Sequence, residues 1–93
     1  MTDEHMENRQ SEKIIFYGTS WCGDCYRSRQ LLKDAGIEYI DIDIDQDAGA
    51  AQKVIHLNQG YRSVPTIVFP DGTILVEPSN IELATELAKY QTP

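Results

Sequence analysis

Two cysteines separated by two residues, Cys22-Gly23-Asp24-Cys25, are the side chains of this 93-residue chain best suited to covalent chemistry. Residues three apart on one helical turn lie close enough for their sulfurs to bond. Such a pair can cycle between dithiol and disulfide and exchange two electrons with a partner disulfide. The motif therefore predicts thiol–disulfide exchange, with Cys22 as the attacking thiol and Cys25 as the resolving thiol.

The two cysteines are expected to differ because they occupy different places at the start of a helix. Unpaired N–H groups and the positive end of the helix dipole favour a thiolate at Cys22. Cys25, one turn further in, is expected to be buried and protonated until it attacks. The charge of Asp24 disfavours a second negative charge nearby and so partly offsets the effect of the dipole on Cys22. Asp24 either tunes Cys22 in this way or is simply a first-turn acid that complements the helix dipole. Trp21 either shields the sulfur or packs against the protein.

Two other uses of the cysteines fit the sequence less well. Free cysteines are common as small buried hydrophobes, but a structural pair has no reason to sit on a strand-to-helix turn beside a glycine. A structural zinc site needs about four ligands, and neither His5 nor His56 has metal-ligand spacing to the pair. We therefore expect no metal site and no tightly bound cofactor.

The hydrophobic pattern predicts the order strand, helix, strand, helix, strand, strand, helix. The expected strands are 14–17, 38–45, 64–69 and 73–77, and the expected helices are 24–35, 48–57 and a last one that opens at 78–80. Pro70-Asp71-Gly72 predicts a hairpin between the last two strands. Right-handed crossovers and this hairpin imply an α/β domain with a four-stranded mixed sheet, its second strand at an edge.

Two sets of side chains complete the expected pattern. The last helix is expected to bury an apolar stripe formed by Ile81, Leu83, Ala84, Leu87 and Ala88. Four aspartates at alternate positions predict a solvated strand face and a helix cap: Asp41, Asp43, Asp45 and Asp47. Arg27 and Arg29 either steer an anionic thiol or pair with acids at the surface.

Composition bounds the domain organisation and the partners. Residues 1–12 are polar and predict a flexible tail, and residues 13–93 predict a single domain. The formal charge of −7 argues against nucleic acid and against an anionic membrane surface as partners. No apolar run is long enough to cross a membrane, and the N-terminus lacks a signal region. We expect a cytoplasmic monomer.

A second motif, Ser63-Val64-Pro65-Thr66, lies before the third strand. Proline is tolerated at the first position of a strand because its missing N–H costs nothing there. Alternatively, the Val64–Pro65 bond is cis and presents the backbone of Val64 to an extended substrate. Spacing alone leaves both interpretations open.

Three segments together resemble the glutaredoxin family, and most closely its mycoredoxin branch. They are Thr19 to Cys25, Arg62 to Thr66, and Asp71-Gly72, within a resemblance that covers about residues 14–90. The resemblance implies a thioredoxin-like fold, a cis Val64–Pro65 bond, and reduction of disulfide-bearing proteins with a low-molecular-weight thiol as co-substrate. It identifies Cys22 as the nucleophile and Cys25 as the second cysteine.

The resemblance also implies where the small thiol binds. In glutaredoxins the thiol lies across the backbone beside the matching Val64-Pro65, and its ends meet residues near Arg62 and the start of the last helix. Ser79 and Asn80 occupy that helix start here.

The identity of the thiol is indicated by two departures from the glutathione-using members. Those members usually carry a lysine shortly before the cysteines and a Gly-Gly pair before the last helix, where this chain has Gly18-Thr19 and Pro78-Ser79. Mycoredoxins resemble this chain because they carry a Pro-Ser pair at the second of these places, before the last helix. Mycothiol is therefore expected in preference to glutathione.

Two further functions fit the same residues. Some glutaredoxins carry an iron–sulfur cluster between two chains, each giving the cysteine that matches Cys22. A thioredoxin-type electron donor would instead be reduced by a flavoenzyme.

Overall fold

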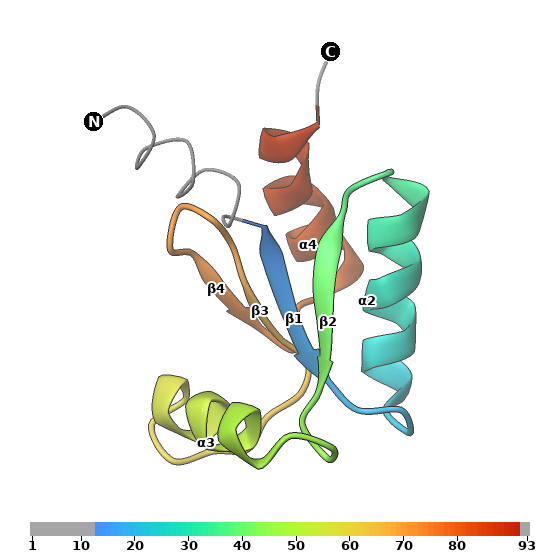
Figure 1. Ribbon diagram of the computed structural model, residues 1–93. Helices are drawn as coiled ribbons and strands as arrows, with labels where there is room; N and C mark the ends of the chain where they lie inside the picture. The colour runs from blue at the N-terminus through green and yellow to red at the C-terminus, as the bar shows by residue number, and fades with distance from the viewer. Residues whose placement is uncertain (1–12, 92–93) are drawn as a thin grey trace, which may run out of the picture.

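The computed structural model describes residues 13–91. The tail expected at residues 1–12, with His5, lies outside the described residues, as do residues 92 and 93. The elements in chain order are β1 (Ile14–Gly18), α2 (Gly23–Asp34), β2 (Tyr39–Asp43), α3 (Ala48–Leu57), β3 (Thr66–Val68), β4 (Ile74–Val76), α4 (Asn80–Leu87) and the 3-10 turn η1 (Ala88–Tyr90). This is the predicted order, in a chain traced in Figure 1.

The four strands form one mixed sheet in the order β2-β1-β3-β4. β1 runs parallel to β2 and antiparallel to β3, and β3 and β4 form the predicted antiparallel hairpin. Gly72 closes that hairpin with φ +94°, a conformation that glycine adopts without steric cost. β2 occupies the expected edge.

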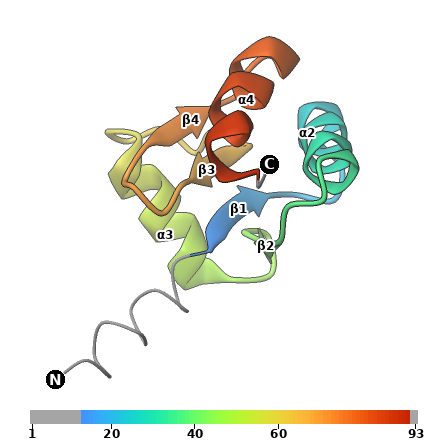
Figure 2. The same cartoon turned by 90° about the horizontal axis from the view of Figure 1, so that it is seen from above.

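The helices cover both faces of the sheet. Viewed from above, α2 and α4 lie on one face and α3 lies on the other (Figure 2). The larger cluster of buried side chains lies between the sheet and the α2–α4 layer: Ile14, Phe16, Cys25, Leu32, Ile67, Phe69, Leu83 and Leu87. A smaller cluster of Tyr17, Ile44 and Val54 lies on the α3 side.

The expected apolar stripe of the last helix is partly wrong. Ile81 is 79% exposed, Ala84 and Ala88 are exposed too, and the buried side chains of α4 are Leu83, Glu86 and Leu87. Because successive helical residues are about 100° apart, positions 83, 86 and 87 share one face, and Ile81 points to the other side.

The second strand is also shorter than expected, and its acidic face is not simply solvated. β2 ends at Asp43, and Ile40 on its other face is 42% exposed. Asp41 accepts hydrogen bonds from Arg29 of α2 at 2.8 and 3.2 Å. Asp47 caps α3 through the N–H of Ala50, as expected for the last of the four aspartates.

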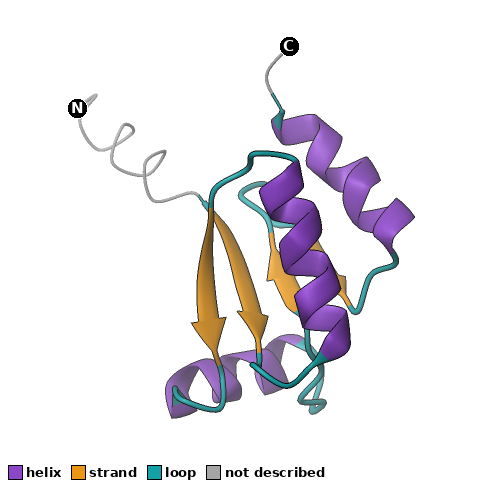
Figure 3. Ribbon diagram, turned by 90° about the vertical axis from the view of Figure 1, so that its right-hand side faces the viewer, coloured by secondary structure: helices purple, strands orange, loops and turns teal. Residues whose placement is uncertain are grey.

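The sheet brings the segments that carry the candidate chemistry to one end. β1 and β2 are parallel, so their carboxyl ends meet there, and the chain leaves β1 into the turn that starts α2 (Figure 3). Three segments therefore lie at the same end of the sheet: the Cys22-to-Cys25 motif, the loop after β2 and the segment before β3.

Candidate active site

Cys22 is the N-cap residue of α2. Its backbone is extended, with φ −89° and ψ 119°, so the helix begins only at Gly23. The backbone N–H of Cys25 donates to Sγ of Cys22 at 3.1 Å, in the way that a serine or aspartate oxygen caps a helix. The sulfur is only partly buried, and both cysteines are free. Cys22 therefore presents its sulfur at a helix N-terminus, within reach of an incoming disulfide.

Cys25 lies one turn further along α2 and is fully buried. Burial is the main reason why its pKa is raised to about 12, with a further contribution from the hydrogen bond with Cys22. The backbone of Thr19 and the charge of Arg29 act in the opposite direction. The two thiols thus occupy very different surroundings, as the motif predicts.

The Val64–Pro65 bond is cis, as the resemblance implies. The thiol of Cys22 lies 3.9 Å from the carbonyl oxygen of Val64, which is the distance expected of a long, weak sulfur contact. Pro65 itself is buried, directly before the first residue of β3. The structure therefore brings the second motif directly against the Cys22 sulfur.

A series of side-chain hydrogen bonds connects the cysteine motif to the last helix. Arg27 donates to Asp24 at 2.9 Å and to Oδ1 of Asn80 at 2.6 Å. Ser79, beside Asn80, is occupied in a capping box: its hydroxyl accepts from the N–H of Glu82, and the Glu82 carboxylate accepts from the N–H of Ser79. Arg27 thus forms an ion pair with Asp24. This confirms the prediction that Arg27 pairs with an acid at the surface.

A second series of side-chain hydrogen bonds lies on the other side of the motif. The indole N–H of Trp21 donates to Oδ2 of Asp45 at 2.8 Å, and Arg62 donates to Oδ1 of the same carboxylate at 2.6 Å. Trp21 is 68% exposed, so it is not packed into the protein interior. Asp45 holds together two predicted thiol-binding residues that are 41 positions apart in the chain.

Asp45 and Gly18 are the site residues that sequence reasoning missed. Asp45 follows the edge strand, whose carboxyl end the parallel topology places beside the cysteine motif, and that topology was the signal for it. At Gly18 an added Cβ would lie 2.7 Å from the Phe16 ring and 3.0 Å from Sγ of Cys25. Only a residue without a side chain leaves room for Cys25 there.

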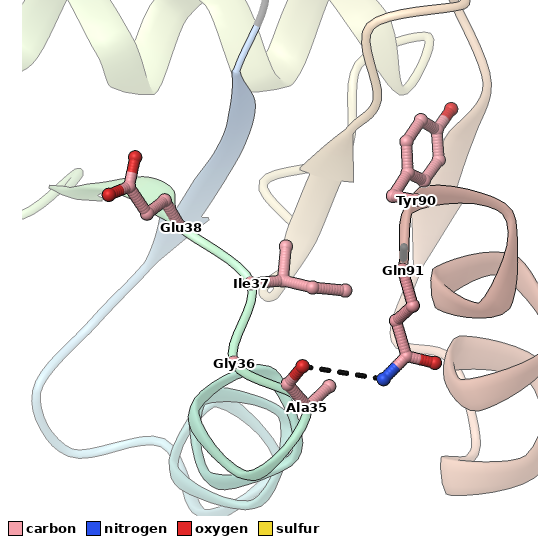
Figure 4. A pocket seen from close by; sticks show the side chains of 6 residues that line it. All are labelled: Ala35, Gly36, Ile37, Glu38, Tyr90 and Gln91. Carbon is pink, nitrogen blue, oxygen red and sulfur yellow. Dashed lines mark hydrogen bonds between the residues drawn. The ribbon is translucent and has the colours of Figure 1, made fainter. Parts of the chain in front are cut away.

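One cavity of the described residues lies away from the two cysteines. It has a volume of about 420 Å³ and lies at the carboxyl end of α2, lined by residues that include Ala35, Tyr90 and Gln91 (Figure 4). Gln91 donates to the carbonyl of Ala35 across it at 3.3 Å. A helix of 12 residues separates this cavity from Cys22.

Residues 13–91 offer neither a metal site nor a membrane-spanning helix. Among these residues no three His, Cys, Asp or Glu side chains come together as metal ligands. None of the helices in this part of the chain combines the length and the apolar character that a membrane span needs.

Comparison with known families decides what this arrangement is. The Glutaredoxin family model matches residues 14–74, from β1 to the start of β4. The chain belongs to the glutaredoxin family. The glutaredoxin fold places the cysteine motif and the cis-proline loop of this chain in contact, and the match spans both.

Individual relatives agree with this assignment. Mycoredoxin 1 of Corynebacterium glutamicum is 40% identical over 75 residues, covering 80% of this chain and 91% of its own length. A glutaredoxin candidate of Mycobacterium tuberculosis is 41% identical over 76 residues, covering 82% of this chain and 90% of its own length. These similarities confirm the resemblance to mycoredoxin-type glutaredoxins.

Solved structures confirm the thioredoxin-like fold. A glutaredoxin from Archaeoglobus fulgidus matches with a TM-score of 0.70 and 25% identity, over 86% of this chain and 90% of that one. The crystal structure of a thioredoxin-like protein matches with a TM-score of 0.68 and 29% identity, over 81% of this chain and 99% of that one.

Proposed function

We propose that this glutaredoxin reduces mixed disulfides between proteins and a small thiol, with Cys22 as nucleophile and Cys25 as resolving thiol. The observation that carries the proposal is the contrast between the two sulfurs. Cys22 is accessible at the start of α2, 3.9 Å from the Val64 carbonyl oxygen, whereas Cys25 is buried behind it with a pKa of about 12. An incoming disulfide can therefore reach Cys22 first.

The proposed reaction has two steps. The Cys22 thiolate attacks the small-thiol sulfur of the mixed disulfide, the substrate S–S bond breaks, and the target protein leaves as a thiol. The small thiol is now bonded to Cys22. In the second step another small thiol attacks the small-thiol sulfur of this adduct, so a disulfide of two small thiols forms and Cys22 leaves as the thiolate. Alternatively, Cys25 attacks Sγ of Cys22, the small thiol leaves, and a Cys22–Cys25 disulfide remains for later reduction.

The surfaces around Cys22 supply the proposed binding groups. The backbone of Val64 and Pro65 lies beside the sulfur, with Trp21 and Arg62 on one side of the motif and the start of α4 at Ser79-Asn80 on the other. Asp24 is the proposed tuning residue, acting with its partner Arg27. These roles rest on position and on the family pattern.

We propose mycothiol in preference to glutathione as the small thiol. The proposal is supported by the 40% identity to Mycoredoxin 1 of Corynebacterium glutamicum and by the Pro78-Ser79 pair at the start of the last helix. We also infer that the protein acts as a monomer in the cytoplasm, a compartment that keeps a dithiol of this kind reduced.

The test is a side-by-side assay in which glutathione, mycothiol and thioredoxin reductase each supply electrons for reduction of one mixed disulfide. We expect mycothiol to sustain the fastest turnover and Cys22→Ser to abolish it. Cys25→Ser should retain part of the activity, because a second thiol can release the adduct. Turnover supported by thioredoxin reductase alone would contradict the small-thiol proposal. A purified brown dimer with thiolate-to-iron absorption would favour cluster carriage instead.

A further inference from the structure

The arginines around the cysteine motif all form ion pairs with aspartates. Three arginines lie within residues 13–91, and each forms an ion pair: Arg27 with Asp24 at 2.9 Å, Arg29 with Asp41 at 2.8 Å and Arg62 with Asp45 at 2.6 Å. Each guanidinium that could have met an anionic ligand thus already faces a carboxylate of this chain.

The pair between Arg62 and Asp45 is the one placed to act on a ligand of Cys22. Arg62 lies two residues before Val64, whose carbonyl oxygen contacts Sγ of Cys22. Asp45 also accepts from Trp21, the residue directly before Cys22. The carboxylate therefore bridges the two segments that border the sulfur.

The bridge is exposed enough for a ligand to reach it. The side chains of Arg62 and Asp45 are 42% and 34% exposed, so the ion pair itself contributes little to stability. The hydrogen bonds from Arg62 and then from Trp21 hold the pKa of Asp45 below its usual range, so this carboxylate is charged at neutral pH.

We propose that Asp45 is a specificity-determining residue that disfavours thiols carrying carboxylates and so selects uncharged thiols. A carboxylate on the ligand must compete for Arg62 with the Asp45 carboxylate, which the fold already holds 2.6 Å from it. A neutral thiol pays no such penalty. The proposal rests on the proposed function, because it concerns the thiol that Cys22 receives.

A single-turnover measurement tests it without any external reductant. The reduced protein is mixed either with bis(2-hydroxyethyl) disulfide, which is uncharged, or with 3,3′-dithiodipropionate, which carries two carboxylates. Cys22 breaks the disulfide and releases one thiol, then Cys25 releases the second, so the probe gains two electrons and two protons and the protein becomes a disulfide. Acid quenching and mass spectrometry give the rates, each divided by the rate of the same probe with dithiothreitol.

The variant Asp45→Asn frees Arg62 to pair with a carboxylate of the anionic probe. We therefore expect the rate with the neutral probe, divided by the rate with the anionic probe, to fall by about two- to five-fold, the range that corresponds to exposed ion pairs. Asp47→Asn is the matched control. It removes the same charge two residues away, and asparagine still caps α3. Adding Arg62→Gln to Asp45→Asn should restore the original ratio, because the released guanidinium is then absent.

Two outcomes would overturn the proposal: a ratio that Asp45→Asn moves no further than Asp47→Asn, or a lowered ratio that persists in the double variant with Arg62→Gln. Neither outcome concerns the proposed function, which fails separately if Cys22→Ser reacts with the neutral probe at the rate of the unmodified protein.

Discussion

At the scale of single residues, two identical thiols acquire different chemistry from their surroundings alone. Cys22 precedes the first helical residue and contacts the Val64 carbonyl, whereas Cys25 is packed among Phe16, Leu32 and other buried side chains. Desolvation penalises a thiolate at Cys25, and this effect outweighs the opposing contributions of the Thr19 backbone and the Arg29 charge. The order of attack follows from this difference.

The raised pKa of Cys25 gives the first prediction. In the reduced protein the ¹³Cβ chemical shift of Cys25 should show no titration between pH 6 and about 10, because burial keeps the thiol protonated until the pH approaches about 12. The thiolate fraction, and with it the resolving rate, should therefore keep rising with pH across this range. A midpoint near the ordinary thiol value of about 8.5 would show that burial does not control Cys25.

The sequence predicts the residues of the site better than their partners. A Cys-X-X-Cys pair between an apolar strand and a helix is a local signal, so the roles of Cys22 and Cys25 can be proposed from spacing. The Trp21–Asp45–Arg62 bridge joins three separate loops, and alternation within a strand says nothing about which of its aspartates meets an arginine. Such partners depend on tertiary structure.

At the scale of elements, the junction of β1 and α2 positions the motif. The strand ends at Gly18, the turn holds Thr19 and Ser20, and Cys22 caps the helix. Cys25 then packs directly over Gly18, where an added Cβ would be 3.0 Å from its sulfur. The close approach of helix and strand depends on this glycine.

Gly18→Ala should therefore destabilise the protein by about 1–3 kcal/mol, as overpacking of a core does. The new methyl would also displace Cys25, so release through Cys25 should slow more than the initial attack by Cys22. Chemical denaturation and single-turnover kinetics measure the two effects. Gly49→Ala serves as control, since its Cβ meets an atom only at 3.5 Å and alanine favours a helix. A Gly18→Ala protein as stable as this control would contradict the packing argument.

Boundaries of elements were predicted less well than their order. The helix 48–57 is reproduced as predicted, because Asp47 caps it and the apolar spacing continues to Leu57. Strands 64–69 and 73–77 shrink to three residues each in β3 and β4, since the ladder excludes Pro65 and the hairpin turn begins at Pro70. Ile81 was misplaced because a short helix has several candidate stripes, and only the packed structure chooses between them.

At the scale of the whole molecule, one sheet separates two apolar clusters of unequal size. The α2–α4 side contains Leu32 and seven other buried residues, and the α3 side contains Val54 with two. Both clusters rest on β1, whose residues alternate between them. Loss of either cluster should therefore expose the other.

Leu32→Ala should cost about 2–5 kcal/mol of unfolding free energy, and Val54→Ala about 1–3 kcal/mol. Both variants should still unfold in one cooperative transition, because the sheet is shared. Urea denaturation followed by far-UV and near-UV circular dichroism tests this. Transitions at different urea concentrations for the two signals would show that the clusters unfold separately.

The most direct test of the central claim compares the two single-cysteine proteins. Cys25→Ser and Cys22→Ser are each exposed to the same uncharged small-molecule disulfide, and mass spectrometry follows the gain of one thiol. We expect Cys25→Ser to acquire the adduct rapidly on Cys22, its remaining cysteine. Cys22→Ser should stay unmodified over the same period, because Cys25 is buried and protonated. Equal rates for the two proteins would contradict the assignment of Cys22 as the nucleophile.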